Sequence, residues 1–111
     1  MTKKRKIHKP SILHQKDGTC YLCIRLNADH SYYPTVQEHH IFDGPNRDHS
    51  EAHGMKVYLC VGHHTFGPES VHKNKKNKRF LQREAQRAFE EEHTHEEFME
   101  IFGRNYLEVD G

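Results

Sequence analysis

The chain has 111 residues, of which 33% are hydrophobic, so it provides for one small domain with a modest apolar core. The formal net charge of +1 at pH 7 does not by itself indicate a partner. No apolar run approaches the ~18 residues of a membrane helix, and no apolar segment follows the basic N-terminus, so we expect a cytoplasmic protein without a membrane span or secretory signal.

Cysteine and histidine are the informative residue types. The three cysteines are an odd number, which disfavours a complete disulfide framework. Twelve histidines are many for a chain of this length. Small domains with few apolar residues often depend on a bound metal for their stability. The composition therefore favours a metal-stabilised domain in a reducing compartment.

The first part of the chain predicts an arm, a turn, a loop and a strand. Residues 1–15 are basic and are expected to form a poorly ordered arm. Residues 19–26 hold a Cys-x-x-Cys turn, and the polar residues 27–33 predict a loop. Residues 34–42 contain the β-branched and aromatic side chains of a short strand. The Asp-Gly-Pro-Asn sequence of residues 43–46 indicates a turn.

The middle of the chain predicts a second strand between two irregular segments. Residues 47–54 are polar and have no clear periodicity, so no regular element is expected there. Residues 55–59 alternate apolar with polar or amphipathic side chains, which predicts a strand. Residues 60–67 are expected to form a turn rich in histidine and glycine.

Two helices are predicted in the last third of the chain. A helical pattern can begin at Pro68, and it is strongest over residues 79–92, where apolar side chains fall on one face. Thr94 and Glu97 have the spacing of a capping box for a second, short helix. Gly103 is expected to end that helix.

The predicted organisation is an α+β fold with a core over residues 16–77 and a helical extension over residues 78–111 that packs on it. The extension contains four phenylalanines, Phe80, Phe89, Phe98 and Phe102. These side chains either belong to the core or form a surface for a second copy or a partner. Core packing is the more common use of such a pattern, so we expect it here.

Two short motifs predict a structural zinc site. Cys20 and Cys23 form a Cys-x-x-Cys turn, and Cys60 and His63 form a Cys-x-x-His turn at the end of the second predicted strand. Together they supply four ligands that suit tetrahedral zinc. Buried hydrophobic cysteines are one alternative, and a redox Cys-x-x-Cys is another. The absence of a βαβ pattern around the motif disfavours the redox alternative.

Two adjacent pairs of histidines predict a second site. His39 and His40 follow the first strand-like run, and His63 and His64 follow the second. Phosphodiester hydrolysis needs a bound divalent ion to relieve charge on the phosphate and a base to activate water. A neutral histidine with a pKa near ~6.5 can act as that base. One histidine is therefore expected to bind metal while another faces the water.

Three segments of the sequence together resemble a known family. They are the Cys-x-x-Cys motif, the His-His-Ile sequence of residues 39–41, and the Leu-Cys-Val-Gly-His-His sequence of residues 59–64. In this order they resemble the HNH endonucleases, which have a ββα-metal fold, and are similar to small phage-type members that include recombination-enhancement nucleases. The resemblance covers about residues 20–72, roughly half of the chain.

The resemblance implies a metal-dependent DNA endonuclease with a role for each histidine. His39 and His64 would hold a catalytic divalent ion, Mg²⁺ or another. His40 would be the general base. His72 would be a third ligand of the ion or a phosphate contact. Zn²⁺ would fill the structural site, and the reaction would serve DNA processing or recombination.

The sequence departs from the family pattern at two places. In the family, a middle asparagine a few residues before the second Cys motif pins the loop between the strands. Here Met55 and Lys56 occupy that place, and the nearest candidates for the same role are Asn46 and His53. His72 also follows His64 at a greater distance than the family's last histidine does. These departures affect the role of the asparagine and that of His72, but not the roles of His39, His40 and His64.

Charged blocks bear on the expected partners. Residues 73–87 are rich in Lys and Arg, and residues 90–100 are rich in Glu. Arg47 and Lys73 are candidate phosphate contacts, because cationic side chains bind phosphate oxygens. Charge runs are also typical of solvated surfaces, and the sequence leaves both interpretations open. DNA is the expected partner, and a second copy or a recombination or packaging protein is a further candidate.

The sequence is compatible with two functions of different classes. One is a metal-dependent DNA endonuclease. The other is a non-catalytic, zinc-stabilised module that binds DNA or a protein. The second has no evident use for His39, His40 and His64 together, so the sequence favours the enzyme.

Overall fold

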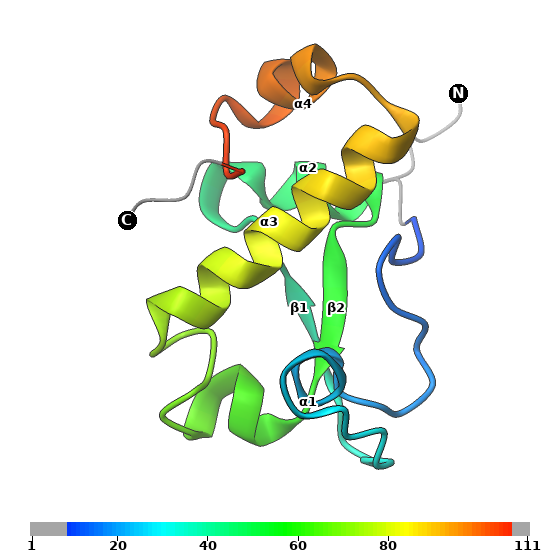
Figure 1. Ribbon diagram of the computed structural model, residues 1–111, viewed down its shortest axis with the longest axis vertical. Helices are drawn as coiled ribbons and strands as arrows, with labels where there is room; N and C mark the ends of the chain where they lie inside the picture. The colour runs from blue at the N-terminus through cyan, green and yellow to red at the C-terminus, as the bar shows by residue number, and fades with distance from the viewer. Residues whose placement is uncertain (1–8, 108–111) are drawn as a thin grey trace, which may run out of the picture.

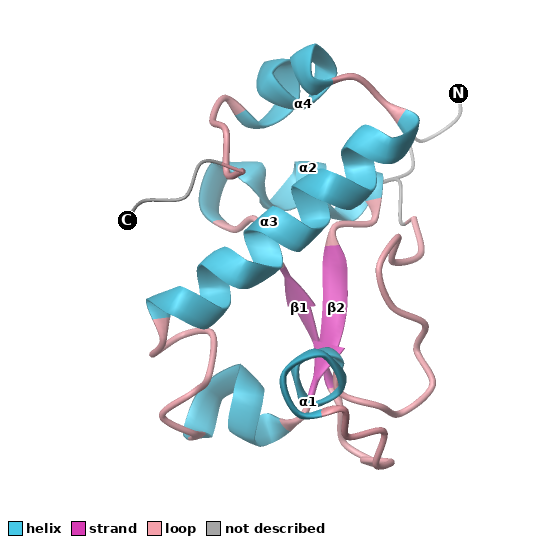
Figure 2. Cartoon of the chain, in the orientation of Figure 1, coloured by secondary structure: helices cyan, strands magenta, loops and turns pink. Residues whose placement is uncertain are grey.

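Two short antiparallel strands lie at the centre of the fold, with helices at both ends of the hairpin (Figure 1). The structure is a computed structural model and describes residues 9–107. Figure 2 shows the elements, which follow one another as α1 (Tyr21–Asn27), β1 (Gln37–His40), α2 (Arg47–His53), β2 (Lys56–Leu59), α3 (Lys75–Glu92) and α4 (His95–Phe102). The α+β class expected from the sequence is confirmed.

The pairing of β1 with β2 determines which side chains share a face of the hairpin. His39 is paired with Val57, and His40 is paired with Lys56. Because consecutive strand residues project to opposite faces, His39 and His40 point away from each other. His39 is only 5% exposed, whereas His40 is half-buried on the other face.

One apolar core joins the hairpin to the C-terminal helices. Leu81, Ala85 and Phe89 of α3 are buried with the hairpin residues in the same core. Phe98 and Phe102 of α4 are also buried there, with ring centroids 5.9 and 4.6 Å from that of Phe42. Three of the four phenylalanines in the extension are thus core residues, and Phe80 is partly buried against the same core.

The segment of residues 9–15 lies along β2 and differs from the expected arm. Ser11 donates a hydrogen bond to the Lys56 carbonyl at 2.5 Å, and the Ile12 amide donates to the Gly54 carbonyl at 2.9 Å. Gly54 has a φ of 69°, and a Cβ there would come within 2.3 Å of the Pro10 carbonyl oxygen, so glycine permits the close approach. The part of the arm that covers residues 1–8 lies outside the described residues.

The capping predictions at the second C-terminal helix are confirmed. Thr94 and Glu97 form a capping box at the start of α4, and Gly103 ends it in a left-handed conformation with a φ of 73°. The preceding helix differs at its start, because α3 begins at Lys75 rather than Pro68. Asn74 caps it by accepting a hydrogen bond from the Asn77 amide.

Residues 47–54, where no element was expected, form the short helix α2. The helix has seven residues, and Ser50 is its buried residue, so its sequence carries no apolar periodicity. None of the helices within residues 9–107 combines the length and apolar character that crossing a membrane would require.

Candidate metal centres

The first centre is the Cys3His cluster, formed by Cys20, Cys23, Cys60 and His63. Cys20 precedes α1 and Cys23 lies in its first turn, so the beginning of a helix brings the two thiols together. Cys60 directly follows β2. His63 lies in a π-helical turn, Gly62–Phe66, that begins two residues after Cys60.

The spacing of the four ligand atoms matches a tetrahedral metal site. Nδ1 of His63 lies 3.5 Å from the sulfur of Cys20, 3.4 Å from that of Cys23 and 3.5 Å from that of Cys60. The sulfurs of Cys23 and Cys60 are 3.9 Å apart. Tetrahedral zinc with Zn–S bonds of about 2.3 Å and Zn–N bonds of about 2.0–2.1 Å separates its ligands by about 3.5–3.8 Å. The predicted residues therefore form one cluster that could hold a metal such as zinc.

The surroundings of the Cys3His cluster disfavour charged thiolates unless a cation is bound. Cys20 is fully buried, and this burial raises the pKa of its thiol to about 12. Burial also raises the pKa of Cys23, whose sulfur lies 3.6 Å from the Tyr33 hydroxyl. Without a metal, both side chains would be neutral thiols at pH 7. A bound cation would stabilise the thiolates that ligate it.

The second centre is the histidine trio, formed by His39, His64 and His72. The ring centroid of His39 lies 5.4 Å from that of His64 and 5.5 Å from that of His72. The centroids of His64 and His72 are 5.0 Å apart. Each residue offers one nitrogen, and the three nitrogens lie within 4.8 Å of one another. The structure thus brings His72 together with His39 and His64 despite the long interval in the sequence.

A folded-back loop brings His72 to the trio. The Gly67 amide donates to the Gly62 carbonyl at 2.9 Å and closes the π-helical turn. A Cβ on Gly67 would lie 2.6 Å from that carbonyl oxygen, so the turn requires glycine. The Val71 amide then donates to the His63 carbonyl at 2.9 Å, which leaves His72 beside His64.

The trio has the electrostatic character of a metal site. Nε2 of His39 is buried, and among residues 9–107 it has no hydrogen-bond partner. Burial, with the neighbouring His64 and His72, lowers the pKa of His39 to about 3, so its ring is neutral at pH 7. Nδ1 of His64 lies 2.6 Å from the Gln37 side-chain oxygen, so it donates there and leaves Nε2 as the free ligand atom.

The ligand atoms of the trio are all nitrogens, which suit a transition-metal ion better than Mg²⁺. Three imidazoles, one of them with a buried nitrogen that has no partner among residues 9–107, are suitable ligands for zinc and other transition metals. Mg²⁺ prefers oxygen ligands, and the three residues of the trio supply none. The expectation of Mg²⁺ therefore finds no support in these residues.

His40, the predicted general base, is not part of the trio. Its Nε2 lies 2.5 Å from a carboxylate oxygen of Glu51 and 3.4 Å from one of Glu38. Lys56 lies among these carboxylates, with Nζ 3.3 Å from Glu51 and 3.8 Å from Glu38. The buried Lys56 contacts both carboxylates, so these side chains form an ion-pair network. Glu38, His40 and Glu51 are also close enough together to hold a metal ion, but the lysine places a positive charge among them.

Ser50 pins the segment after β1, which is the structural task expected of an asparagine. Its hydroxyl donates to the Phe42 carbonyl at 2.8 Å and accepts from the Phe42 amide at 3.0 Å. Asn46 instead ends a short 3₁₀ turn, and His53 packs against Phe89 with ring centroids 5.6 Å apart. Ser50 was not predicted from the sequence, because a serine in a polar segment carries no signal of this kind.

The two candidate phosphate contacts lie in different surroundings. Arg47 is exposed at the first residue of α2. Lys73 is exposed directly after His72, and its Nζ donates to the Phe66 carbonyl at 3.3 Å. Lys73 thereby helps to close the loop that carries His72.

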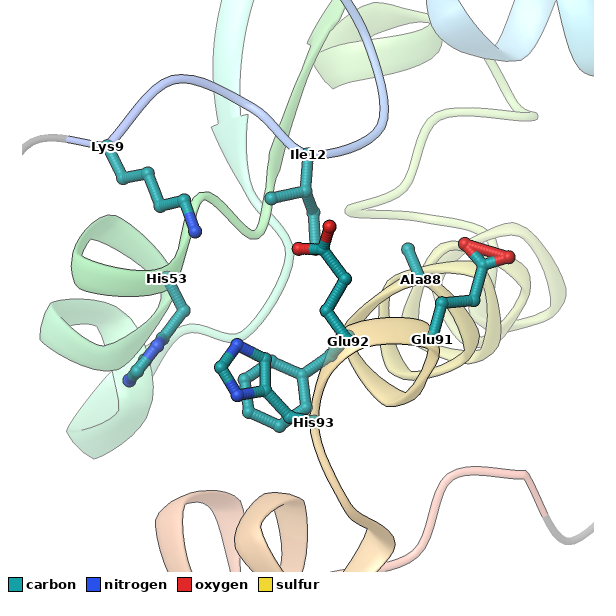
Figure 3. Close-up of a pocket in the computed structure, with 8 residues that line it drawn as sticks. Lys9, Ile12, His53, Ala88, Glu91, Glu92 and His93 are labelled. Carbon is teal, nitrogen blue, oxygen red and sulfur yellow. The ribbon is translucent and has the colours of Figure 1, made fainter.

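A separate cavity of about 520 Å³ lies between the segment of residues 9–15, α2 and the end of α3. Figure 3 shows Lys9, His53 and His93 around it together with Glu92. The cavity shares no lining residue with the trio or the Cys3His cluster. Its mixture of cations and carboxylates does not select a ligand of one charge.

Comparison with known proteins finds no family model, no curated protein and no solved structure that matches this chain.

Proposed function

We propose that this protein is a metal-dependent DNA endonuclease of the HNH type that hydrolyses phosphodiester bonds at a divalent ion held by the histidine trio. The observation that carries the proposal is the convergence of His39, His64 and His72 from three separate segments, with the buried Nε2 of His39 lacking a partner among residues 9–107. A non-catalytic module would use the Cys3His cluster for stability. It would have no use for a second set of ligands.

The trio and its neighbours would prepare the site for a phosphate. The bound ion would polarise the phosphate and stabilise the leaving oxygen. Gln37 holds His64 in the tautomer that leaves Nε2 for the ion. The fold-back of residues 67–74 places His72, which is exposed, on the side that a substrate can reach.

His40 remains the proposed general base, acting from the opposite face of β1. In phosphoryl transfer the attacking and leaving oxygens lie roughly in line on opposite sides of phosphorus. Because His39 and His40 project to opposite faces at the end of β1, a phosphate at the strand end could have the ion on one side and the base on the other. When Nε2 of His40 donates to Glu51, Nδ1 is left as the proton acceptor.

The proposal is tested by incubating supercoiled plasmid with the purified chain and a series of divalent ions. The wild type is expected to nick or linearise the plasmid. His39→Ala is expected to be inactive while retaining its far-UV circular dichroism. His30→Ala is a matched control, because His30 is an exposed histidine outside both centres.

Two outcomes would count against the enzyme. An intact plasmid with every ion, combined with DNA binding, would indicate the non-catalytic module. Equal cleavage by His39→Ala and the wild type would mean that any nuclease activity comes from elsewhere.

A further inference from the structure

The outer face of α3 carries cationic side chains along much of its length. Leu81 and Ala85 of this helix are fully buried in the core. At 3.6 residues per turn, Lys76, Arg83 and Arg87 lie on roughly the opposite side of the helix. Lys76 and Arg87 are exposed, and Arg83 is half-buried. The side of α3 that faces away from the core is therefore positively charged.

Arg25 of α1 adds a fourth cation to this face. Its guanidinium carbon lies 5.8 Å from the centroid of the Phe80 ring, between the levels of Lys76 and Arg83 along the helix. Glu84 holds it there, with a carboxylate oxygen 2.8 Å from the guanidinium. The same oxygen accepts a hydrogen bond from the Tyr21 hydroxyl at 2.9 Å. We call these four cations the outer row: Arg25, Lys76, Arg83 and Arg87.

The outer row has the length of a short stretch of nucleic acid backbone. Lys76 and Arg87 are separated by eleven residues of α3, which rise about 16 Å along the helix axis. One strand of a DNA duplex carries a phosphate for about every 3.4 Å of its axis. The row is therefore long enough to face about five phosphates of one strand.

The charges of the outer row oppose the stability of the helix that carries them. Lys76 lies in the first turn of α3, where the helix dipole disfavours a cation, and that turn holds no acidic residue. Arg83 and Arg87 are four residues apart, a spacing at which like charges destabilise a helix. Within residues 9–107 neither Lys76 nor Arg83 has an ion-pair partner. Arg87 lies 3.9 Å from Glu84, which Arg25 already contacts. A polyanion along this face would offset these costs.

The position of the outer row connects it with the histidine trio. Lys76 follows His72 by four residues, which span at most about 14 Å. At the other end of α3, the exposed carboxylates of Glu91 and Glu92 would repel a phosphate. A strand with one phosphate at the trio could thus continue along α3 as far as Arg87.

We infer that the outer row binds the backbone of the nucleic acid that the trio would cleave, with the phosphates next to the scissile one running along α3. This inference rests on the proposed function, and it assigns to α3 a role in holding the substrate. The contacts are to phosphate alone and carry no sequence preference.

The inference is tested by the salt dependence of binding to an intact DNA duplex without added divalent ion, measured by fluorescence anisotropy. Lys76→Gln and Arg83→Gln should each reduce the slope of log affinity against log salt by about 0.9, and weaken binding about 8-fold at 0.1 M salt. Lys78→Gln is the matched control, because Lys78 lies on another side of the same helix and contacts Asp43 at 3.4 Å. It should leave the slope unchanged.

Three outcomes would overturn the inference. An equal change of slope in Lys78→Gln would show diffuse attraction to the whole helix rather than binding along one face. An unchanged slope in either Lys76→Gln or Arg83→Gln would show that the row does not follow a backbone. Polyglutamate that competes as well as an equal concentration of duplex phosphates would indicate a surface for an acidic protein. Because cleavage is not measured, a failed nuclease proposal leaves these outcomes readable.

Discussion

His63 and His64 are consecutive in the chain, yet their side chains belong to two different centres. Nδ1 of His63 lies 3.4–3.5 Å from the three cysteine sulfurs, whereas His64 faces His39 and His72. The π-helical turn that carries both residues therefore links the Cys3His cluster directly to the trio. A metal in the first centre would fix the backbone that positions a ligand of the second.

Loss of a cysteine ligand is expected to unfold the domain. Cys23→Ser would leave three ligands, and structural zinc contributes an apparent ~10–16 kcal/mol in small zinc domains, compared with ~5–15 kcal/mol for the total stability of a typical domain. We expect loss of about one zinc per chain and of cooperative unfolding, measured by metal analysis and thermal circular dichroism. His30→Ala, in the loop after α1, should keep both. A Cys23→Ser variant that unfolds at the wild-type temperature would show that the cluster is not structural.

Acid is expected to destabilise the protein through His39 when the trio is free of metal. The folded-state pKa of His39 is about 3, below its ordinary value of 6.5, so its contribution to stability is present above pH 6.5 and is lost as the pH falls toward 3. The loss should reach about 1.4 kcal/mol per pH unit in this range. Urea unfolding between pH 7 and pH 5 measures it. In His39→Gln the free energy of unfolding should depend less steeply on pH. An identical slope in the variant and the wild type would show that His39 is not the source of the pH dependence.

Glu51 is expected to act as a positioning residue for His40. Glu51→Gln should lower kcat by about tenfold with little change in KM, because outer partners of functional histidines typically contribute factors of about 10–100. His40→Ala should lower kcat by about 10²–10⁴.

Glu38→Gln is the control for Glu51→Gln, because a carboxylate oxygen of Glu38 lies 3.4 Å from Nε2 of His40, compared with 2.5 Å for Glu51. Its effect should be smaller. Normal activity of Glu51→Gln and His40→Ala would remove His40 from the mechanism.

The ion preference of cleavage is expected to follow the all-imidazole donor set. Co²⁺ or Ni²⁺ should support faster plasmid cleavage than Mg²⁺ at equal concentration, because imidazole nitrogen suits these ions and oxygen suits Mg²⁺. Initial rates across the ion series provide the measurement. Highest activity with Mg²⁺ would indicate that carboxylate or phosphate oxygens, rather than the trio, dominate ion binding.

The sequence predicted the elements whose signals are local. The alternation of residues 55–59, the apolar face of residues 79–92 and the Thr94–Glu97 spacing each correspond to an element of the structure. The helix α2 was missed because a seven-residue helix with one buried residue has no periodicity to detect. The π-helical turn was missed because it depends on the close approach of Gly67 to Gly62.

The ligand residues were predictable, and their partners were not. Residue type and spacing indicated the Cys3His cluster, whereas the metal-binding roles of the trio were expected from the resemblance to the HNH endonucleases. His72 was expected there although its distance from His64 departs from the family pattern. Gln37 and Glu51 are ordinary polar residues that meet His64 and His40 across 27 and 11 positions of the chain. Contacts of this kind depend on the register of the hairpin and the placement of α2, which no local pattern encodes.

The central claim is that the chain has two separate metal centres, and metal stoichiometry after equilibrium dialysis against Co²⁺ or Zn²⁺ tests it most directly. The wild type and His30→Ala should bind about two ions per folded chain, and His39→Ala about one, because the Cys3His cluster is left intact. One ion per chain in all three proteins would contradict the trio as a metal centre, and with it the proposed nuclease.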